Sequence, residues 1–152
     1  REFGVHSAMP MSQAVRLCPD AIVLPVRMKR YVEFSKQIHA VFQKFTPQIE
    51  PISLDEAFLD VTGSISLFGQ SENIAKKIKQ IILIETGLTV SAGVASSKFV
   101  AKIASDIDKP DGLTVGPPNG VRDFLDPLPI KKNVGGWESD TTGIKSTQHP
   151  HF

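Results

Sequence analysis

The sequence is poor in cysteine and has no long apolar run, and each absence excludes a class of protein. The single cysteine, Cys18, cannot close a disulfide within the chain, which is typical of proteins from a reducing compartment. There is no apolar run of about eighteen residues and no charged leader followed by an apolar segment, so the sequence predicts neither a membrane span nor a secretion signal. We therefore expect a cytoplasmic protein with no membrane partner.

An excess of charge of one sign is also missing. Lysine and arginine number 17, against 16 aspartate and glutamate residues, and the net charge is +1. The charge of the whole chain thus argues neither for nor against a polyanionic partner, and any basic surface must be local. With 152 residues, of which 41% are hydrophobic, the chain is long enough for one globular domain with a core.

Three segments have the three-and-four spacing of apolar residues that is typical of amphipathic helices. The first starts at Met28 and stops before Pro47. The second covers residues 71–86, with Gly87 as its stop signal, and the third covers residues 98–107, with Ser96 or Ser97 as its cap. A shorter helix capped by Ser12 is predicted before them.

Short runs of strand-forming residues lie between these helices, at 48–54, 56–62, 88–95 and 112–116. The resulting order predicts an α+β fold. If one strand preceded the first long helix, the order would be the split β-α-β-β-α-β pattern of ferredoxin-like domains. In that topology the second and third strands form an antiparallel hairpin beside the first strand, so their junction lies at one end of the sheet.

Two adjacent carboxylates, Asp55 and Glu56, lie at this junction. One interpretation is a polar turn between two strands, since carboxylates are common in turns. The other is a divalent metal site, because metal binding offsets the cost of placing charges between buried strands. The residues alone leave both interpretations open.

Several segments, in their order and spacing, resemble the Y-family of translesion DNA polymerases, most closely its bacterial DNA polymerase IV type. The resemblance extends over about residues 1–132. Its most specific motifs are "SLDEAFLD" and "SKFVAKIASDIDKPDG", which lie within the third and fifth of the following segments. They are "FGVHSAMPMSQAVRLCP", "YVEFSKQI", "SLDEAFLDVTGS", "LFG", "TVSAGVASSKFVAKIASDIDKPDGLTV" and "FLDPLPI".

The resemblance implies a ferredoxin-like polymerase palm that lacks its first strand, with part of the fingers before it and the start of the thumb after it. By the family pattern, the partial fingers are residues 1–26, the palm 27–115 and the start of the thumb 116–132. Two magnesium ions are implied, held by three acidic residues. Asp55 and Glu56 match two of these; the third would lie upstream of Arg1, so we expect a piece of a longer chain.

The resemblance also assigns two basic residues and the partners. Arg1 matches an arginine of the fingers and Lys109 a lysine of the palm, and both would contact the triphosphate of an incoming nucleotide. The implied partners are primer–template DNA and deoxynucleoside triphosphates (dNTPs). A sliding clamp is expected to bind the full-length protein through regions that this sequence does not contain.

The resemblance ends abruptly after a pair of lysines. Residues 133–152 are polar, rich in glycine and without periodicity, so we expect them to be disordered and without function. If the encoding DNA is read with a shift of one base, the codons can encode the family's thumb hairpin in place of this tail. We therefore interpret the tail as non-native or frameshifted.

The sequence thus predicts a template-directed, magnesium-dependent polymerase that adds dNTPs to a primer 3′-hydroxyl past damaged bases, and it predicts that this chain alone is inactive. Two rival classes stay open. Another ferredoxin-like two-metal enzyme, such as a nucleotide cyclase, could also place carboxylates near a hairpin, but it would not be expected to share the "SKFVAKIASDIDKPDG" segment. The other is an interaction module without catalysis.

Overall fold

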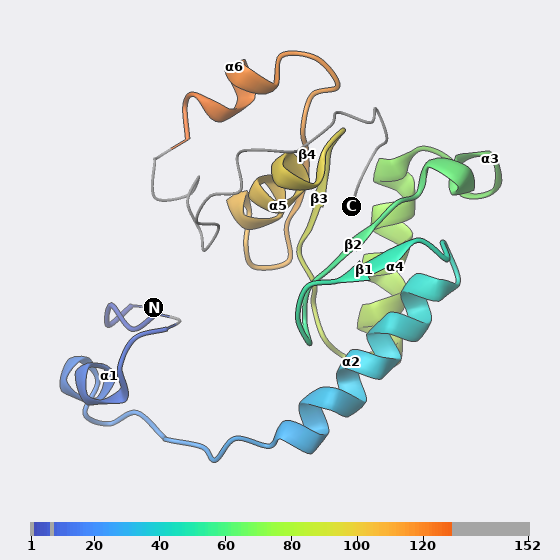
Figure 1. Ribbon diagram of the computed structural model, residues 1–152. Helices are drawn as coiled ribbons and strands as arrows, with labels where there is room; N and C mark the ends of the chain where they lie inside the picture. The colour runs from blue at the N-terminus through green and yellow to red at the C-terminus, as the bar shows by residue number, and fades with distance from the viewer. Residues whose placement is uncertain (1, 7, 129–152) are drawn as a thin grey trace.

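A computed structural model describes residues 2–6 and 8–128 of the chain (Figure 1). The expected nucleotide-binding role of Arg1 and the expected disorder of residues 133–152 concern positions outside these ranges. The last four residues of the expected start of the thumb, 129–132, also lie outside them.

The described residues alternate between helices and short strands, which confirms the α+β class. The helices are α1 (Met11–Leu17), α2 (Met28–Gln43), the 3₁₀ turn η1 (Thr62–Ser64), α3 (Ile65–Phe68), α4 (Ser71–Thr86), α5 (Lys98–Ile107) and α6 (Val121–Leu125). The strands are β1 (Ile49–Pro51), β2 (Ala57–Leu59), β3 (Ala92–Val94) and β4 (Leu113–Val115).

The three long helices form where the apolar spacing predicts them. Gly87 ends α4 in the left-handed conformation, with φ +71°, and Ser97 caps α5 by accepting a hydrogen bond from the backbone N of Val100 at 3.4 Å. The prediction of Ser12 as a cap is wrong, because α1 begins directly after Pro10 and has no side-chain cap. The short elements η1, α3 and α6 were not predicted, since they are too short to show a period.

The strands form two separate two-stranded sheets. β1 and β2 are the predicted antiparallel hairpin, in which Ile49 is opposite Leu59. β3 and β4 are parallel, and the chain between them passes through α5, as parallel strands require a crossover. β2 and β3 are not hydrogen-bonded to each other, which leaves space between the two sheets.

The main core lies between the hairpin and the helices α2 and α4. Its fully buried side chains include Val41 of α2, Leu59 of β2 and Ile78 of α4. Figure 1 shows α2 and α4 packed together beside the hairpin. Burial of these apolar faces holds the junction between β1 and β2 in place.

Helix α5 packs unusually closely on β3. A Cβ atom on Gly93 would lie 2.0 Å from the carbonyl O of Ala101 and 2.4 Å from the backbone N of Ser105. Only glycine permits this approach. The contact brings the polar face of α5 next to the hairpin, where the site described below is formed.

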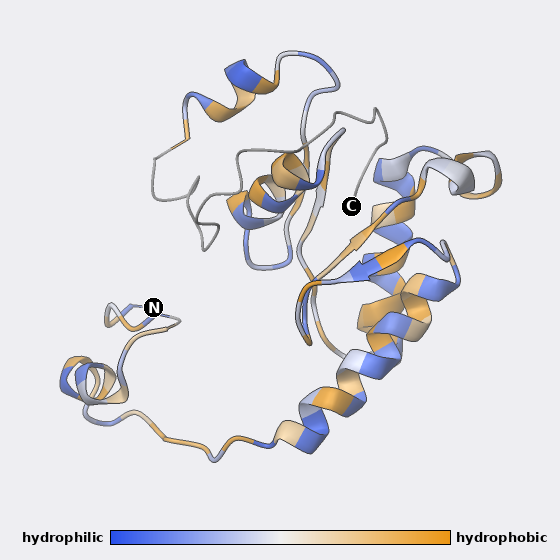
Figure 2. Ribbon diagram, in the orientation of Figure 1, coloured by the Kyte–Doolittle hydropathy of each residue, from blue (hydrophilic) through white to orange (hydrophobic). Residues whose placement is uncertain are grey.

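The segment before α2 is far less buried. Helix α1 has no buried residue, and Ile22 and Leu24 in the connection to α2 are 88% and 74% exposed. Figure 2 shows this hydrophobic connection running outside the packed part of the protein. In the part of the chain that the structure describes, no helix has the length and apolar character needed to cross a membrane.

Candidate catalytic pocket

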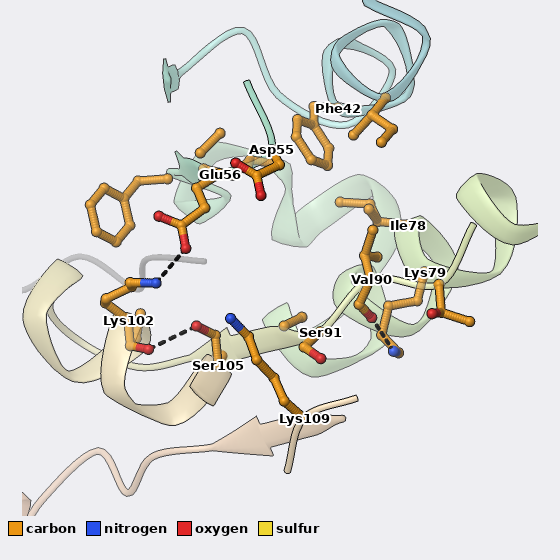
Figure 3. A pocket seen from close by; sticks show the side chains of 18 of the residues that line it. Phe42, Asp55, Glu56, Ile78, Lys79, Val90, Ser91, Lys102, Ser105 and Lys109 are labelled. Atoms are coloured by element: carbon orange, nitrogen blue, oxygen red, sulfur yellow. Dashed lines mark hydrogen bonds and ion pairs between the residues drawn. The ribbon is translucent and has the colours of Figure 1, made fainter. Parts of the chain in front are cut away.

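A pocket of about 580 Å³ lies in the space between the two sheets (Figure 3). β2 forms one wall and β3 another, while α5 and the loop after it close a third side. Phe42 and Ile78 contribute apolar side chains from the α2 and α4 side. Its polar lining comes from residues far apart in the sequence, among them Asp55, Glu56, Lys79, Lys102 and Lys109.

Asp55 and Glu56 lie in a tight bend directly before β2. The backbone N atoms of Ile52 and Ser53 both donate to the carbonyl O of Glu56, at 2.9 and 3.2 Å. The Ser53 hydroxyl donates to Oδ1 of Asp55 at 2.7 Å and accepts from the Asp55 backbone N at 3.4 Å. The residues therefore form a polar turn, and this turn presents both carboxylates to the pocket.

Glu56 is paired with Lys102, a residue that the sequence did not single out. The Lys102 Nζ lies 2.5 Å from Oε1 of Glu56 and 3.5 Å from Oδ2 of Asp106, one helical turn further along α5. Figure 3 shows Lys102 facing Glu56 across the pocket. The pair joins α5 to the hairpin bend at the pocket wall.

Lys109 lines the same pocket, and Figure 3 shows its amino group pointing into the space shared with Glu56. Its Nζ also lies 2.6 Å from Oδ1 of Asp106. The structure therefore brings together Asp55, Glu56 and Lys109, three of the four site residues predicted from the sequence. The fourth, Arg1, is outside the described residues.

The pKa values of Lys102 and Asp106 are shifted in the directions expected for stable ion pairs. Burial disfavours the charge on Lys102, but its hydrogen bond to Glu56 and its attraction to Asp106 outweigh this and raise the pKa of Lys102 above its ordinary value. Burial likewise disfavours the charge on Asp106, but the hydrogen bond from Lys109 and the nearby Lys102 charge lower the pKa of Asp106.

Replacement of Asp106 by asparagine is expected to reduce the free energy of unfolding near neutral pH. Because the folded pKa of Asp106 is depressed below 3.8, the carboxylate stabilises the fold above that value, and this contribution is lost as the pH falls through the folded pKa. Since the side chain is 36% exposed, we expect a loss of only about 0.5–1 kcal/mol after screening by solvent. Urea denaturation at about pH 7 and about pH 3 measures this loss of free energy of unfolding.

The difference between wild type and Asp106→Asn should shrink at the lower pH, because below 3.8 Asp106 takes up its proton in the unfolded chain and folding must then remove it. Asp20→Asn is the matched control, because Asp20 is exposed and is not in a salt bridge with any described residue. If Asp106→Asn reduced the free energy of unfolding as much at about pH 3 as at about pH 7, these ion pairs would not be the source of the loss.

Lys79 is a second residue that the sequence did not single out. Its side chain is 16% exposed, and its Nζ donates to Oδ1 and the backbone O of Asp111, at 2.5 and 3.0 Å, and to the backbone O of Val90. These bonds tie α4 to the loop that carries Lys109. No local signal distinguishes Lys79 from Lys76 and Lys77, since only the folded chain brings residue 111 beside it.

The donor set fits part of a magnesium site. Asp55 and Glu56 offer the hard carboxylate oxygens that magnesium takes, and both face the pocket. Within residues 2–6 and 8–128, however, no group of three or more His, Cys, Asp or Glu residues is placed to hold a metal ion. Glu56 also already holds an ammonium group, from Lys102.

Known proteins show the same combination of sequence and fold. DNA polymerase IV of Ralstonia nicotianae is 52% identical over 135 residues, which are 89% of this chain and 38% of that protein. DNA polymerase IV of Marinomonas sp. is 55% identical over 131 residues, which are 86% of this chain and 37% of that protein. The chain thus spans less than two fifths of the length of these relatives.

Solved structures agree with these relatives. The insertion ternary complex of Dbh DNA polymerase matches with a TM-score of 0.79 and 42% identity, over 89% of this chain and 40% of that chain. DinB from Sulfolobus solfataricus gives the same TM-score and identity, over 91% and 41%. The model of the impB/mucB/samB family matches residues 1–106. This match includes Asp55 and Glu56 and covers more than two thirds of the 152 residues. The Y-family resemblance is thus confirmed, and the chain belongs to the impB/mucB/samB family.

Proposed function

We propose that this chain carries catalytic residues of a template-directed translesion DNA polymerase, which adds dNTPs to a primer 3′-hydroxyl. The observation that carries the proposal is the convergence of Asp55, Glu56 and Lys109 on one pocket from separate elements. Relatives named DNA polymerase IV and the ternary complex of Dbh DNA polymerase support it. We propose primer–template DNA and dNTPs as its partners.

Asp55 and Glu56 are the proposed magnesium ligands. Asp55 would be shared between two ions, and Glu56 would bind the ion near the primer terminus. Two such ions stabilise the charge that gathers on the attacking and leaving oxygens during phosphoryl transfer. Because no group of three or more His, Cys, Asp or Glu residues among those described is placed to hold a metal ion, we propose that the chain alone does not extend a primer.

Lys109 is the proposed contact for the nucleotide triphosphate. A lysine ammonium is a compact charge with three donors, which suits phosphate oxygens. Its position in the pocket of the two carboxylates supports this role, because the nucleotide must reach the metal ligands and the lysine together. A similar contact by Arg1 stays a proposal that rests on the sequence resemblance.

The proposed division is partial fingers (1–26), palm (27–115) and the start of the thumb (116–132), and the arrangement of the two sheets supports the palm. In a ferredoxin-like palm the first strand pairs beside the hairpin. β2 and β3 are not paired with each other, and the pocket occupies the space between them. We propose the apolar part of this space as the place of that strand, which leaves the end with Asp55, Glu56 and Lys109 for the metal ions and the nucleotide. Clamp binding remains a proposal from the resemblance, and a cytoplasmic location remains a proposal from the sequence composition.

A graft tests the proposed function. The matching segment of Ralstonia nicotianae DNA polymerase IV is replaced by residues 2–128 of this chain, since the two are 52% identical over 135 residues. The expected result is magnesium-dependent primer extension by the chimera and none by the 152-residue chain alone. A folded chimera that binds primer–template DNA but does not extend it would contradict the polymerase assignment. Extension by the chain alone, abolished by Asp55→Ala, would contradict its predicted inactivity.

A further inference from the structure

Four side chains at the pocket form a row of alternating charge. Glu56 contacts Lys102 at 2.5 Å, Lys102 approaches Asp106 at 3.5 Å, and Asp106 contacts Lys109 at 2.6 Å. The row joins the hairpin bend, helix α5 and the loop after α5. A proposed metal ligand is at one end and the proposed triphosphate contact at the other.

Lys102 has two carboxylate partners, one close and one more distant. Its ammonium is at hydrogen-bonding distance from Glu56, and the longer distance to Asp106 leaves that second partner within reach of a small side-chain rotation. Lys102 and Asp106 are four residues apart on one helix, a spacing that favours their pairing without movement of the backbone. Lys102 therefore does not lose a partner if Glu56 is taken by another cation.

A divalent cation at Glu56 would compete with this ammonium. Both are positive, and both would bind the same half-buried carboxylate, at a short separation where like charges repel. A cation bound at Glu56 would thus drive Lys102 toward Asp106. Asp106 already pairs with both Lys102 and Lys109, and a closer approach of Lys102 would make it hold Lys109 less strongly.

We propose that Lys102 occupies the cation position at Glu56 until a metal ion displaces it, and that its transfer to Asp106 frees Lys109 for a nucleotide triphosphate. Lys102 is then a positioning residue that couples two binding events. The inference rests on the proposed function, since that function supplies the metal and the nucleotide. Such coupling is reciprocal, so nucleotide binding at Lys109 also favours metal binding at Glu56.

The test uses the 152-residue chain and Mn²⁺ as the metal probe, with binding followed by electron paramagnetic resonance. Lys102→Met is expected to tighten Mn²⁺ binding by about five-fold, the lower end of typical coupling factors. Lys76→Met is the matched control, because Lys76 pairs with Glu72 at 2.6 Å on α4 and does not line the pocket. It should leave Mn²⁺ affinity unchanged, whereas Asp55→Asn should weaken it.

A second readout follows the lysines themselves. In wild type, Mg²⁺ should shift the NMR signals of the Cε–Hε groups of both Lys102 and Lys109, although only Glu56 and Asp55 are proposed to touch the ion. In Lys102→Met the Lys109 shift should be lost. A purely structural role for Lys102 predicts no metal-dependent shift at Lys109 in either protein.

The outcomes separate the two proposals. Mn²⁺ binding that depends on Asp55 but is equal or weaker in Lys102→Met, with no Mg²⁺ effect on Lys109, overturns the relay and leaves the metal site intact. No Asp55-dependent binding by wild type or Lys102→Met overturns the relay and counts against the proposed metal ligands. Binding that appears only in Lys102→Met supports the relay, because removal of the ammonium then opens the site.

Discussion

Asp55→Asn in the chimera is expected to reduce the rate of primer extension by about 1,000-fold. The substitution keeps an oxygen at the position that accepts the hydrogen bond from the Ser53 hydroxyl at 2.7 Å, so the bend before β2 should persist. It removes the charge proposed to ligate both magnesium ions, whose stabilisation of the reacting phosphoryl group is worth several kcal/mol. A loss of about 4 kcal/mol corresponds to the stated factor. Single-turnover extension at saturating nucleotide measures it.

Glu72→Gln in the same chimera is the control for this loss. Glu72 is also a carboxylate, but it pairs with Lys76 on α4 and does not line the pocket. Its replacement should change the rate less than two-fold, in line with the small effect of most exposed ion pairs. An Asp55→Asn chimera that retains a tenth or more of the rate, roughly, would show that Asp55 is not a shared metal ligand.

Gly93→Ala is expected to have the largest effect on the fold itself. The added Cβ would meet the carbonyl O of Ala101 at 2.0 Å and the backbone N of Ser105 at 2.4 Å, and backbone atoms cannot rotate away. Helix α5 must therefore move off β3, at a cost of about 3 kcal/mol or more. The expected result is a melting temperature lower by roughly 10 °C, measured by thermal unfolding.

Gly63→Ala provides the matched control, since nothing lies within 4 Å of the position that its Cβ would occupy. Gly63→Ala should change the free energy of unfolding by less than about 0.5 kcal/mol. Equal stabilities of the Gly93 and Gly63 variants would contradict the close packing of α5 on β3. Displacement of α5 should also weaken the contact of Lys102 with Glu56, because Lys102 is carried by that helix.

The local pattern of the sequence was sufficient for most of the fold. The bounds of α4 and α5 follow from apolar spacing together with Gly87 and Ser97, which are signals read within one or two turns of the helix. The antiparallel hairpin of β1 and β2 was predicted for the same reason, because a short connection leaves the two strands little choice but to pair. Pairing of β3 with β4 was not predicted, since the sequence does not show which distant strands will meet.

The residues of the candidate site were also predicted only in part from the sequence. Asp55, Glu56 and Lys109 were found through motifs, which are local in the sequence. Lys79, Lys102 and Asp106 were missed, although they contact the same bend and loop. Charged residues on a helix surface look alike in sequence, and their roles depend on what packs opposite them.

The sequence by itself determined the α+β class, the long helices, the hairpin and the family to which the two adjacent acids point. These depend on local propensity, on spacing and on motifs, all of which are present in the unfolded chain. Only the tertiary structure decided that Glu56 holds Lys102 across 46 residues of sequence. The physical reason is that an ion pair between distant residues exists only after the packing of α5 on β3 has brought their side chains together.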